Sequence, residues 1–305
     1  MSRKIWVSID GGGTKTEICA CDSNGKNIYD NFFGRSNYKT AGLDETTNTL
    51  KFAFYNMLES LQCNLDDIQG VVLASAGCDT EQDKTIYESI MCEIGMPKNR
   101  VLICNDTEVV FRALSDQDGI CVVAGTGSIV CAYNQEGLMD RVGGWGAPLS
   151  DLGSGYWIGS KILKHMLCWL EGIDVEEYAV YQEIAQRYSQ EGVNLAWILS
   201  GLSVTEIASV SILAFQFAEQ GDLLCRKVIA QAADIIKRQI VTLCKKVHFK
   251  NTFTIVAVGG LFSDHQFYEK VSTGVSKELN QELVFLRPID SPAEDGLKYA
   301  RKIFG

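Results

Sequence analysis

Two glycine-rich turns carry the residue types that bind phosphate groups. The first is IDGGGTKT at residues 9–16, and the second is VAGTGS at residues 123–128. Consecutive glycines let the backbone turn tightly and bring its N–H groups close to a bound anion. Each turn follows one apolar run and precedes another. The pair therefore predicts two loops that hold one polyphosphate, the alternative being two ordinary hairpin turns.

Neither turn matches the common phosphate-binding motifs. No stretch supplies the Gly-x4-Gly-Lys-Ser/Thr pattern of a Walker A loop. A Rossmann fingerprint has three spaced glycines and opens a helix. Here the third glycine position after Gly125 and Gly127 is Val130, and strand-like residues follow. We therefore expect the anion at turns between strands and not at a helix N-terminus.

The bulk composition excludes several classes of protein. The chain has 305 residues, of which 46% are hydrophobic, and a net charge of −10. This length predicts two domains, and the acidic balance argues against a nucleic-acid-binding surface. No stretch approaches the length of an uncharged apolar membrane span, and no signal peptide is visible. We expect a cytoplasmic protein that binds neither nucleic acid nor membrane.

Eleven cysteines raise the question of a metal site or disulfides. No Cys-x-x-Cys pair occurs, and several cysteines lie in apolar runs. Cys19 and Cys21 alternate with Ala20 along an expected strand, so both point to the same side. We interpret the cysteines as small buried hydrophobic residues.

The expected order of elements occurs twice along the chain. The first half reads as strands at 5–9, 17–22 and 27–33, a helix at 44–61, a strand at 69–76, a helix at 81–94, a strand at 101–104 and a helix after Asp106. The second half reads as strands at 119–124, 129–133 and 138–142, a helical insertion over 155–248, a strand at 253–258, a helix from 264, a strand at 283–286 and a helix at 293–303. Both halves are βββαβαβα, which predicts domains at 1–117 and 118–305. The C-terminal helix, 293–305, is a candidate to pack on the first domain.

The duplicated halves and their turns resemble the superfamily of actin, hexokinase and Hsp70. A more specific block, GGWG at 143–146 followed by SDLGSGYWIG at 150–159, closely resembles N-acetylglucosamine kinases of the BadF/BadG/BcrA/BcrD ATPase group. The resemblance covers the whole chain. It implies an α/β fold of two ribonuclease-H-like (actin-like ATPase) domains with a cleft between them that binds ATP and sugar, and with a helical insertion in the second domain.

The resemblance also implies an activity. The expected reaction is ATP-dependent phosphorylation of an amino sugar, foremost N-acetylglucosamine to its 6-phosphate, with Mg²⁺ as the metal. N-acetylmuramic acid and glucosamine are alternative substrates. Family members often form homodimers, so a homodimer is expected.

The phosphate contacts that the resemblance implies come from both turns. The first turn supplies Gly12, Gly13 and Thr14, and Lys15 adds either a point charge beside them or a solvated side chain. The second turn supplies Gly125, Thr126, Gly127 and Ser128. The glycine pair Gly259 and Gly260 resembles the turn on the adenosine side, although such pairs are also common in ordinary turns.

Two aspartates are implied in the chemistry. Phosphoryl transfer to a hydroxyl needs charge neutralisation, alignment and a base for the proton. The resemblance makes Asp106 the base, and makes Asp10 a Mg²⁺ ligand through water, because Mg²⁺ keeps much of its hydration shell. From the residues alone, an aspartate before a helix is more often an N-cap, and Asp10 could form a turn.

The sugar contacts implied by the resemblance are Asn37, Asp106, Asp151, Gly144 and Trp145. The alternatives are a loop turn for Asn37, an N-cap for Asp151 and a core position for Trp145. One departure concerns Leu152, because related sequences commonly carry a glutamate there. The loss of that carboxylate leaves the identity of the sugar open.

Two other classes of protein stay open. ATPase activators of CoA-ester reductases and dehydratases belong to the same broad group, and they hold an iron–sulfur cluster at a dimer interface through cysteines. Here the cysteines are scattered through apolar runs. A non-enzymatic sugar or nucleotide sensor is the other class, but the chain has no basic segment of the kind that binds DNA.

Overall fold

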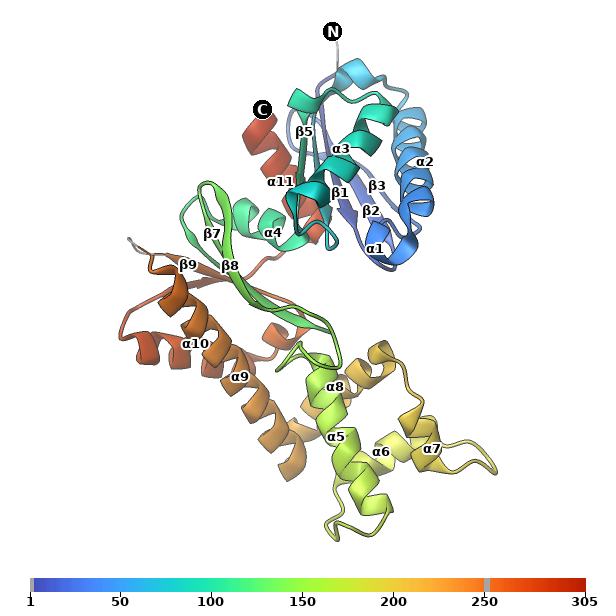
Figure 1. Cartoon of the computed structure of the whole chain (residues 1–305), viewed down its shortest axis with the longest axis vertical. Helices are drawn as coiled ribbons and strands as arrows, with labels where there is room; N and C mark the ends of the chain where they lie inside the picture. Colours follow the sequence, from blue (N-terminus) through green and yellow to red (C-terminus); the bar gives the residue numbers. More distant parts are fainter. Residues whose placement is uncertain (1–2, 250–252) are drawn as a thin grey trace. The chain divides into compact units, whose positions relative to one another are not determined.

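The structure, a computed structural model, describes residues 3–249 and 253–305 (Figure 1). The chain divides into unit 1, which comprises Met1–Asp116 and Pro288–Gly305, and unit 2, which comprises Gln117–Arg287. Each unit is built on one mixed sheet flanked by helices. This confirms the predicted α/β class. Among the described residues, none of the helices combines the length and apolar character needed to cross a bilayer.

The sheet of unit 1 has the strand order β3-β2-β1-β4-β5. Its strands are β1 (Ile5–Gly11), β2 (Thr16–Cys21), β3 (Asn27–Phe33), β4 (Ile68–Ser75) and β5 (Val101–Cys104). Strand β1 is antiparallel to β2 and parallel to β4, and β4 is parallel to β5. The carboxyl ends of β1, β4 and β5 therefore meet at one edge, where the first glycine turn and Asp106 follow.

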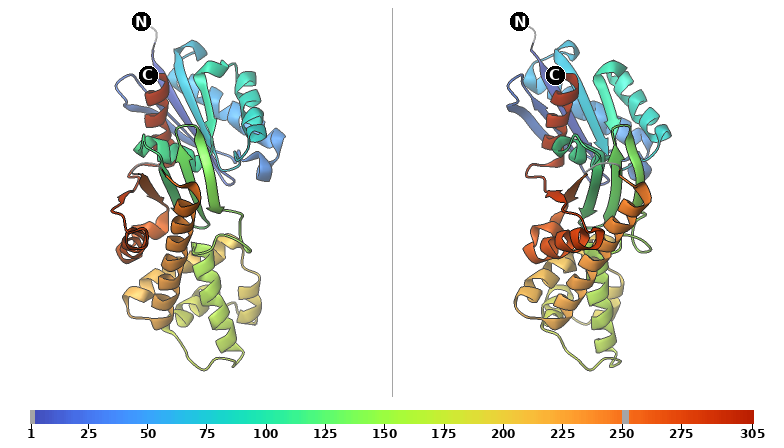
Figure 2. Two further views of the ribbon diagram at one scale, coloured as in Figure 1. Left: turned by 60° about the vertical axis from the view of Figure 1, so that its left-hand side comes forward. Right: turned by 90° about the vertical axis from the view of Figure 1, so that its left-hand side faces the viewer.

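Helices cover both faces of this sheet. They are α1 (Tyr38–Ala41), α2 (Leu43–Leu61), α3 (Glu81–Ile94), α4 (Asp106–Leu114) and α11 (Pro292–Phe304). Alternate side chains of a strand point to opposite faces, so Val7 packs with Phe54 of α2, whereas Trp6 packs with Leu297 of α11. Figure 2 shows α11 in dark red beside the blue strands.

Cys19 and Cys21 both lie on the face that α11 covers. This confirms the prediction that the two side chains point to the same side of their strand.

Unit 2 repeats the same arrangement. Its sheet has the order β10-β9-β6-β7-β8, formed by β6 (Gly119–Ala124), β7 (Ser128–Asn134), β8 (Gly137–Gly143), β9 (Thr254–Val258) and β10 (Val284–Leu286). Strand β6 is antiparallel to β7 and parallel to β9, so β6 corresponds to β1. The predicted repeat of βββαβαβα is thereby confirmed, and the second glycine turn lies at the same place in its sheet as the first.

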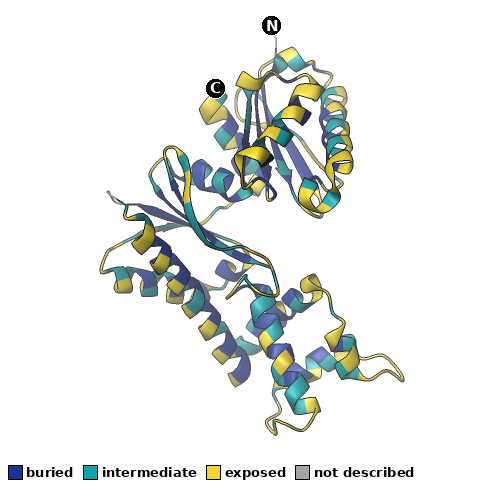
Figure 3. Cartoon of the chain, viewed as in Figure 1, coloured by how far each residue is buried: buried dark blue, intermediate teal, exposed yellow. Residues whose placement is uncertain are grey.

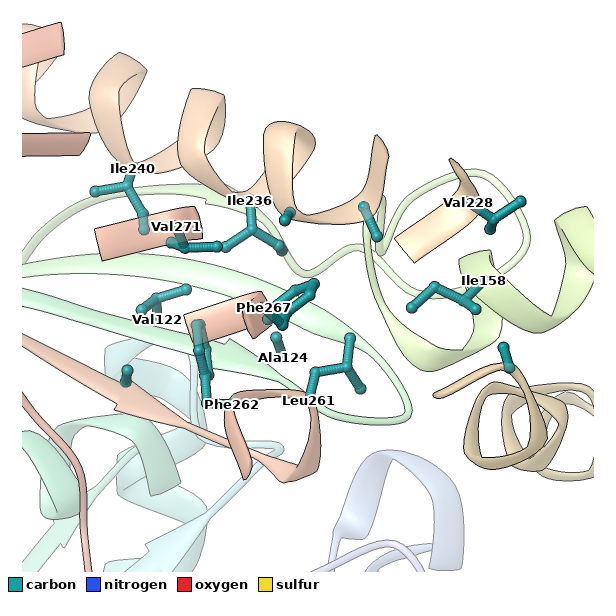
Figure 4. Close-up of a cluster of buried hydrophobic side chains, with 14 of the residues drawn as sticks. Val122, Ala124, Ile158, Val228, Ile236, Ile240, Leu261, Phe262, Phe267 and Val271 are labelled. Atoms are coloured by element: carbon teal, nitrogen blue, oxygen red, sulfur yellow. The ribbon is translucent and has the colours of Figure 1, made fainter. Parts of the chain in front are cut away.

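The insertion after β8 is helical, as predicted. Its helices are α5 (Gly155–Leu170), α6 (Ala179–Tyr188), α7 (Leu195–Ser200), α8 (Val204–Glu219) and α9 (Leu223–Val247), and α10 (His265–Leu279) follows β9. Side chains of β6 such as Val122 and Ala124 share a buried cluster with Ile236 of α9 and Phe267 of α10 (Figure 4). In Figure 3 the helices carry their buried residues in stripes with exposed residues between them. The core thus fixes the ends of β6 and β9, from which the candidate nucleotide-binding loops project.

Candidate active site

The first glycine turn closes the β1–β2 hairpin and is anchored to the segment before α1. The N–H of Gly12 donates to the Lys15 carbonyl at 3.0 Å. The Gly12 carbonyl accepts from the backbone N–H groups of Ser36 and Asn37, at 3.1 Å each. The turn therefore has a defined backbone shape and a fixed relation to Asn37.

The tip of this turn faces solvent. Gly13, Thr14 and Lys15 are exposed, and the Lys15 ammonium lies 3.9 Å from the centre of the Phe32 ring. This cation–π contact holds the lysine charge beside the turn. The geometry allows a ligand to approach the tip, and Lys15 is not simply solvated.

Asp10 is a residue of β1 and lies directly opposite Glu17 of β2. Burial, together with the charges of Asp106 and Glu17, raises the pKa of Asp10 to about 7, although the Lys15 ammonium acts in the opposite direction. Mg²⁺ binds through one or two carboxylates and several waters, so a single aspartate is a sufficient protein ligand. Asp10 therefore fits the role of a water-mediated magnesium ligand.

A group of metal-type side chains lies near Asp10. Within residues 3–249 and 253–305, the one such group comprises Glu17, Cys19 and Asp30, whose ligand atoms lie within 4.8 Å of one another. Glu17 already accepts hydrogen bonds from the Cys19 thiol at 3.7 Å and from the Ser291 hydroxyl at 3.1 Å. A thiol is not a magnesium ligand, so this group does not replace Asp10.

Asp106 is the first residue of α4, directly after β5. Asn105 is the N-cap, because its side chain accepts from the Thr107 N–H at 3.0 Å. The Asp106 Oδ1 accepts from the same N–H at 2.8 Å. Burial raises the pKa of Asp106, the Thr107 N–H opposes that shift, and the charge of Asp79 adds to it. A carboxylate with a raised pKa is suited to accept a proton near neutral pH.

Asn37 is the N-cap of α1. Its side chain is 9% exposed, and its Oδ1 accepts from the Lys39 N–H at 3.1 Å. Gly77, in the loop after β4, makes room for it, since a Cβ on Gly77 would lie 2.3 Å from the Asn37 Oδ1. Asn37 is therefore held beside the loop that follows β4, at the same sheet edge as the first turn.

The second glycine turn rests on the start of α5. The Gly125 N–H donates to the Gly127 carbonyl at 2.9 Å, which closes the turn. The N–H groups of Gly155 and Tyr156 donate to the carbonyls of Gly125 and Thr126 at 2.7 and 3.1 Å. The first N–H groups of α5 are thus used to hold the turn, and the turn itself stays the predicted anion-binding site.

Ser128 differs from the other residues of this turn. It is buried, and its hydroxyl donates to the Leu152 carbonyl at 2.9 Å. Its backbone carbonyl accepts from the Gly144 N–H at 3.0 Å. The Ser128 hydroxyl therefore secures the loop at 150–153, and it does not present its proton to a phosphate.

Asp151 lies next to the second turn. Its backbone is left-handed, with a φ of +56°, and its Oδ1 accepts from the Gly146 N–H at 3.2 Å. A Cβ on Gly127 would lie 2.6 Å from the Asp151 Oδ2, so the glycine permits this close approach. The N-cap of α5 is Ser154, so the alternative that Asp151 caps this helix is wrong.

Trp145 is a surface residue. It is 74% exposed, and the guanidinium of Arg141 lies 3.9 Å from the centre of its ring. The alternative that Trp145 belongs to the core is therefore wrong. Leu152 is 45% exposed, so Trp145 and Leu152 are apolar surfaces available to a ligand.

A pocket of about 420 Å³ adjoins the second turn. It is lined by Gly125 and Thr126 of the turn, Gly155 of α5, Gly260 and Leu261 after β9, and residues of α8, namely Thr205, Ala208, Ser209, Ser211, Ile212 and Phe215. Gly259 precedes this lining at the end of β9. An apolar pocket with a few hydroxyl groups suits a nucleoside.

The α8 residues of this pocket were not predicted. The sequence does indicate that residues 205, 208, 209 and 212 share one side of a helix, because they recur at helical spacing. That spacing gives no indication of which side of the helix faces a pocket and which faces the core. Ile212 is apolar and yet 60% exposed, so it is the clearest sign that this side of α8 lines a pocket.

The cysteines are mostly core residues, as predicted. Of the eleven, nine are buried, Cys168 is partly exposed and Cys92 is exposed. Burial raises the pKa of thiols such as Cys78 and Cys244, in each case to about 12. Thiols of this kind stay protonated at neutral pH.

The fold of two such units is that of the actin-like ATPases and sugar kinases. The crystal structure of a protein from Chromobacterium violaceum, provisionally named N-acetylglucosamine kinase, has a TM-score of 0.72 and 19% identity, and the match covers 98% of this chain and 100% of that chain. The chain belongs to the BadF/BadG/BcrA/BcrD ATPase family, whose model matches residues 7–293.

Two curated relatives match most of the chain. The N-acetyl-D-glucosamine kinase of Dictyostelium discoideum is 28% identical, with 85% of this chain and 86% of the relative covered. The N-acetylmuramic acid/N-acetylglucosamine kinase of Clostridium acetobutylicum is 27% identical, with 84% and 85% covered. Both relatives are thus similar to this chain over nearly their full length.

Proposed function

We propose that this protein is an ATP-dependent kinase that phosphorylates an amino sugar, foremost N-acetylglucosamine at its 6-hydroxyl. The observation that carries the proposal is the similarity to an N-acetyl-D-glucosamine kinase over 85% of the chain. The family match over residues 7–293 supports the use of ATP. The site residues described above are proposed to supply the groups that such a reaction needs.

The nucleotide is proposed to bind through unit 2 and the first turn of unit 1. In unit 2, the pocket between α8 and the turn after β9 takes the adenosine, with Ile212 and Leu261 against it. The turn residues Gly125, Thr126 and Gly127, with Gly12, Gly13 and Thr14 of unit 1, offer backbone groups to the phosphates. Asp10 would hold Mg²⁺ through water, and the ion would neutralise phosphate charge.

The sugar is proposed to contact Asn37, Gly144, Trp145 and Asp151, and to present one hydroxyl to Asp106. The hydroxyl oxygen forms a bond to the γ-phosphorus while the bond from that phosphorus to the ADP oxygen breaks. The hydroxyl proton passes to the Asp106 carboxylate, whose raised pKa favours this transfer. The products are the sugar phosphate and ADP.

More than one amino sugar fits the proposed reaction. One relative is named for N-acetylmuramic acid as well as N-acetylglucosamine. Leu152 places an apolar side chain beside Asp151, where the family resemblance leads us to expect a carboxylate. N-acetylmuramic acid and glucosamine therefore stay as alternative substrates, and the homodimer and the cytoplasmic location stay predictions.

The test is ADP release from Mg-ATP against a panel of sugars. The panel contains N-acetylglucosamine, N-acetylmuramic acid, glucosamine, N-acetylmannosamine, glucose and a sample without sugar. Release that depends on one amino sugar supports the proposal and names the substrate. Equal release without sugar contradicts it and favours an ATPase activator, in which case iron content and a protein partner are the next measurements.

A further inference from the structure

Lys39 connects two aspartates at the sheet edge that carries the candidate active site. Its Nζ lies 3.0 Å from the Asp79 Oδ2 and 3.0 Å from the Asp83 Oδ2. Lys39 belongs to α1, whereas both aspartates belong to the segment that runs from the end of β4 into α3. One ammonium group therefore ties α1 to the loop after β4 and to the start of α3.

Asp83 is the fixed end of this connection. It is 4% exposed and accepts from the N–H groups of Asp79 and Thr80 at 2.9 and 2.8 Å, as well as from the Tyr38 hydroxyl. With Thr80 it forms the capping box of α3. A carboxylate with this many donors has little freedom to move, so it holds both Lys39 and Tyr38 in place.

Asp79 continues the connection to the proposed base. Its Oδ1 accepts from the side-chain amide of Asn105 at 3.3 Å. Asn105 caps α4 and directly precedes Asp106. The charge of Asp79 also acts on Asp106 itself, since it contributes to the raised pKa of that carboxyl. Lys39 thus offsets the charge of an aspartate that acts on the proposed base.

The other end of the connection is Asn37, which is proposed to bind the sugar. The Asn37 Oδ1 accepts from the backbone N–H of Lys39 itself, and Asn37 begins the short helix α1. A helix of this length has almost no stability of its own. The segment is held instead by contacts outside the helix. The Asn37 N–H donates to the Gly12 carbonyl, and the Lys39 side chain ties α1 to Asp79 and Asp83.

We propose that Lys39, through Asp79, is a positioning residue that holds Asn37 and Asp106 in register on one sugar. This inference rests on the proposed function. The physical reason is that Lys39 pairs with Asp79, and Asp79 accepts from Asn105, the residue before Asp106. The bridge therefore links the segment that carries Asn37 with the segment that carries Asp106. Small displacements between a hydroxyl and its base lower the rate strongly.

The experiment compares Lys39→Met and Lys39→Arg with the wild-type protein. Methionine keeps the apolar stem and removes the charge, whereas arginine can still bridge two carboxylates. Lys51→Met is the matched control, because Lys51 pairs with Glu93 at 2.7 Å between α2 and α3 of the same unit and lies outside the proposed site. Each protein is assayed for kcat, for KM of sugar and of ATP, and for its thermal midpoint.

The positioning role predicts a specific pattern. Lys39→Met lowers kcat about 10- to 100-fold and raises KM for the sugar, because Asp106 and Asn37 lose their alignment. KM for ATP stays within about twofold, since the adenosine pocket belongs to unit 2. Lys39→Arg recovers most of the activity, and Lys51→Met behaves like the wild type.

Other results would overturn the inference. A Lys39→Met protein with wild-type kcat and sugar KM shows that the bridge has no role in the reaction. A loss of activity that only follows the unfolded fraction, or an arginine variant as impaired as the methionine variant, shows a structural role alone. If the wild type releases no ADP with any amino sugar, the proposed function itself fails and this inference fails with it.

Discussion

Asn105 and Asp106 are neighbours at the start of α4, but they have different roles. The Asn105 side chain accepts the hydrogen bond from the Thr107 N–H that caps α4, so the helix does not depend on Asp106 for its cap. The Asp106 carboxylate is partly buried, with a raised pKa. An aspartate that helix formation does not require, in a place where ionisation is costly, is a candidate for function.

The first prediction concerns the charge of Asp106. Asp106→Asn should lower kcat for sugar-dependent ADP release about 10²- to 10⁴-fold, because an amide cannot accept the hydroxyl proton. The thermal midpoint should be unchanged, because Asn105 still caps α4. Asp44→Asn is the control, since Asp44 occupies the first turn of α2 as Asp106 occupies that of α4. Normal turnover by Asp106→Asn would remove Asp106 from the role of base.

The second prediction concerns the side chain of Leu152. Its carbonyl is fixed by Ser128 and by the Gln239 amide at 3.4 Å, but the side chain is exposed, so Leu152→Glu should fold normally. A carboxylate there should disfavour the anionic N-acetylmuramic acid. The ratio of kcat/KM for N-acetylglucosamine over N-acetylmuramic acid should rise about five- to tenfold, the size expected for like charges near a surface.

The neutral variant Leu152→Gln is the control for this charge effect. It has the shape of glutamate without the negative charge, so it should leave the ratio near that of the wild type. An equal change in both variants would show that shape and not charge decides the preference. No change in either would place Leu152 away from the sugar.

At the scale of elements, the junction between α1 and α3 depends on one carboxylate. Burial opposes ionisation of Asp83, but hydrogen bonds from Tyr38, Lys39 and the backbone more than offset it and hold its pKa well below the ordinary value. A lowered pKa in the folded state contributes stability above the ordinary pKa of aspartate, near 4. This contribution is lost as the pH falls below that value.

The third prediction concerns the stability that the ionised Asp83 contributes above the ordinary pKa of aspartate. Asp83→Asn should lower the free energy of unfolding by about 1–3 kcal/mol at pH 7, because donors to the carboxylate lose their partner. The difference from the wild type should shrink by about 1 kcal/mol or more as the pH falls to 3. Urea unfolding at a series of pH values measures it, with the exposed Asp44→Asn as control. A difference that is the same at every pH would contradict the role of the charge.

At the scale of the whole molecule, both units contribute a glycine turn to the proposed function. A Cβ on Gly125 would meet no atom of the described residues within 4 Å, and a Cβ on Gly13 would lie 3.4 Å from the Thr40 hydroxyl. Both turns therefore have room for a methyl group as far as the protein is concerned. Any effect of adding one must come from a ligand.

The fourth prediction uses this room. Gly13→Ala and Gly125→Ala should each raise KM for ATP about 3- to 30-fold, because the methyl group blocks close approach of a phosphate to the backbone. Thermal midpoints without ligand should match the wild type. Gly260→Ala serves as a comparison on the adenosine side, where the added Cβ also meets no protein atom. A normal KM for ATP in one of the first two variants would exclude that turn from nucleotide binding.

Much of the fold could be predicted because the signals are local. Apolar alternation and turn residues placed β1 to β3 and β6 to β8 within about two residues of their observed ends. Helix α1 was not predicted, because its four residues carry no periodic pattern and are held by the Asn37 cap and by Lys39. The alternative prediction that Asp151 is the N-cap of α5 was wrong, because the N-cap is Ser154. Both residue types suit an N-cap, so the sequence does not distinguish them.

The sequence by itself determined the repeated order of strands and helices and the two glycine turns, because each depends on residues close in the chain. The family resemblance supplied Asp10, Asn37, Asp106 and Asp151 as candidates. The tertiary structure decided what surrounds them. Lys39 meets Asp79 and Asp83 across 40 and 44 residues of chain, and α8 contributes to the pocket beside Gly125. Such contacts arise from the packing of elements, and no local pattern specifies which distant side chains packing brings together.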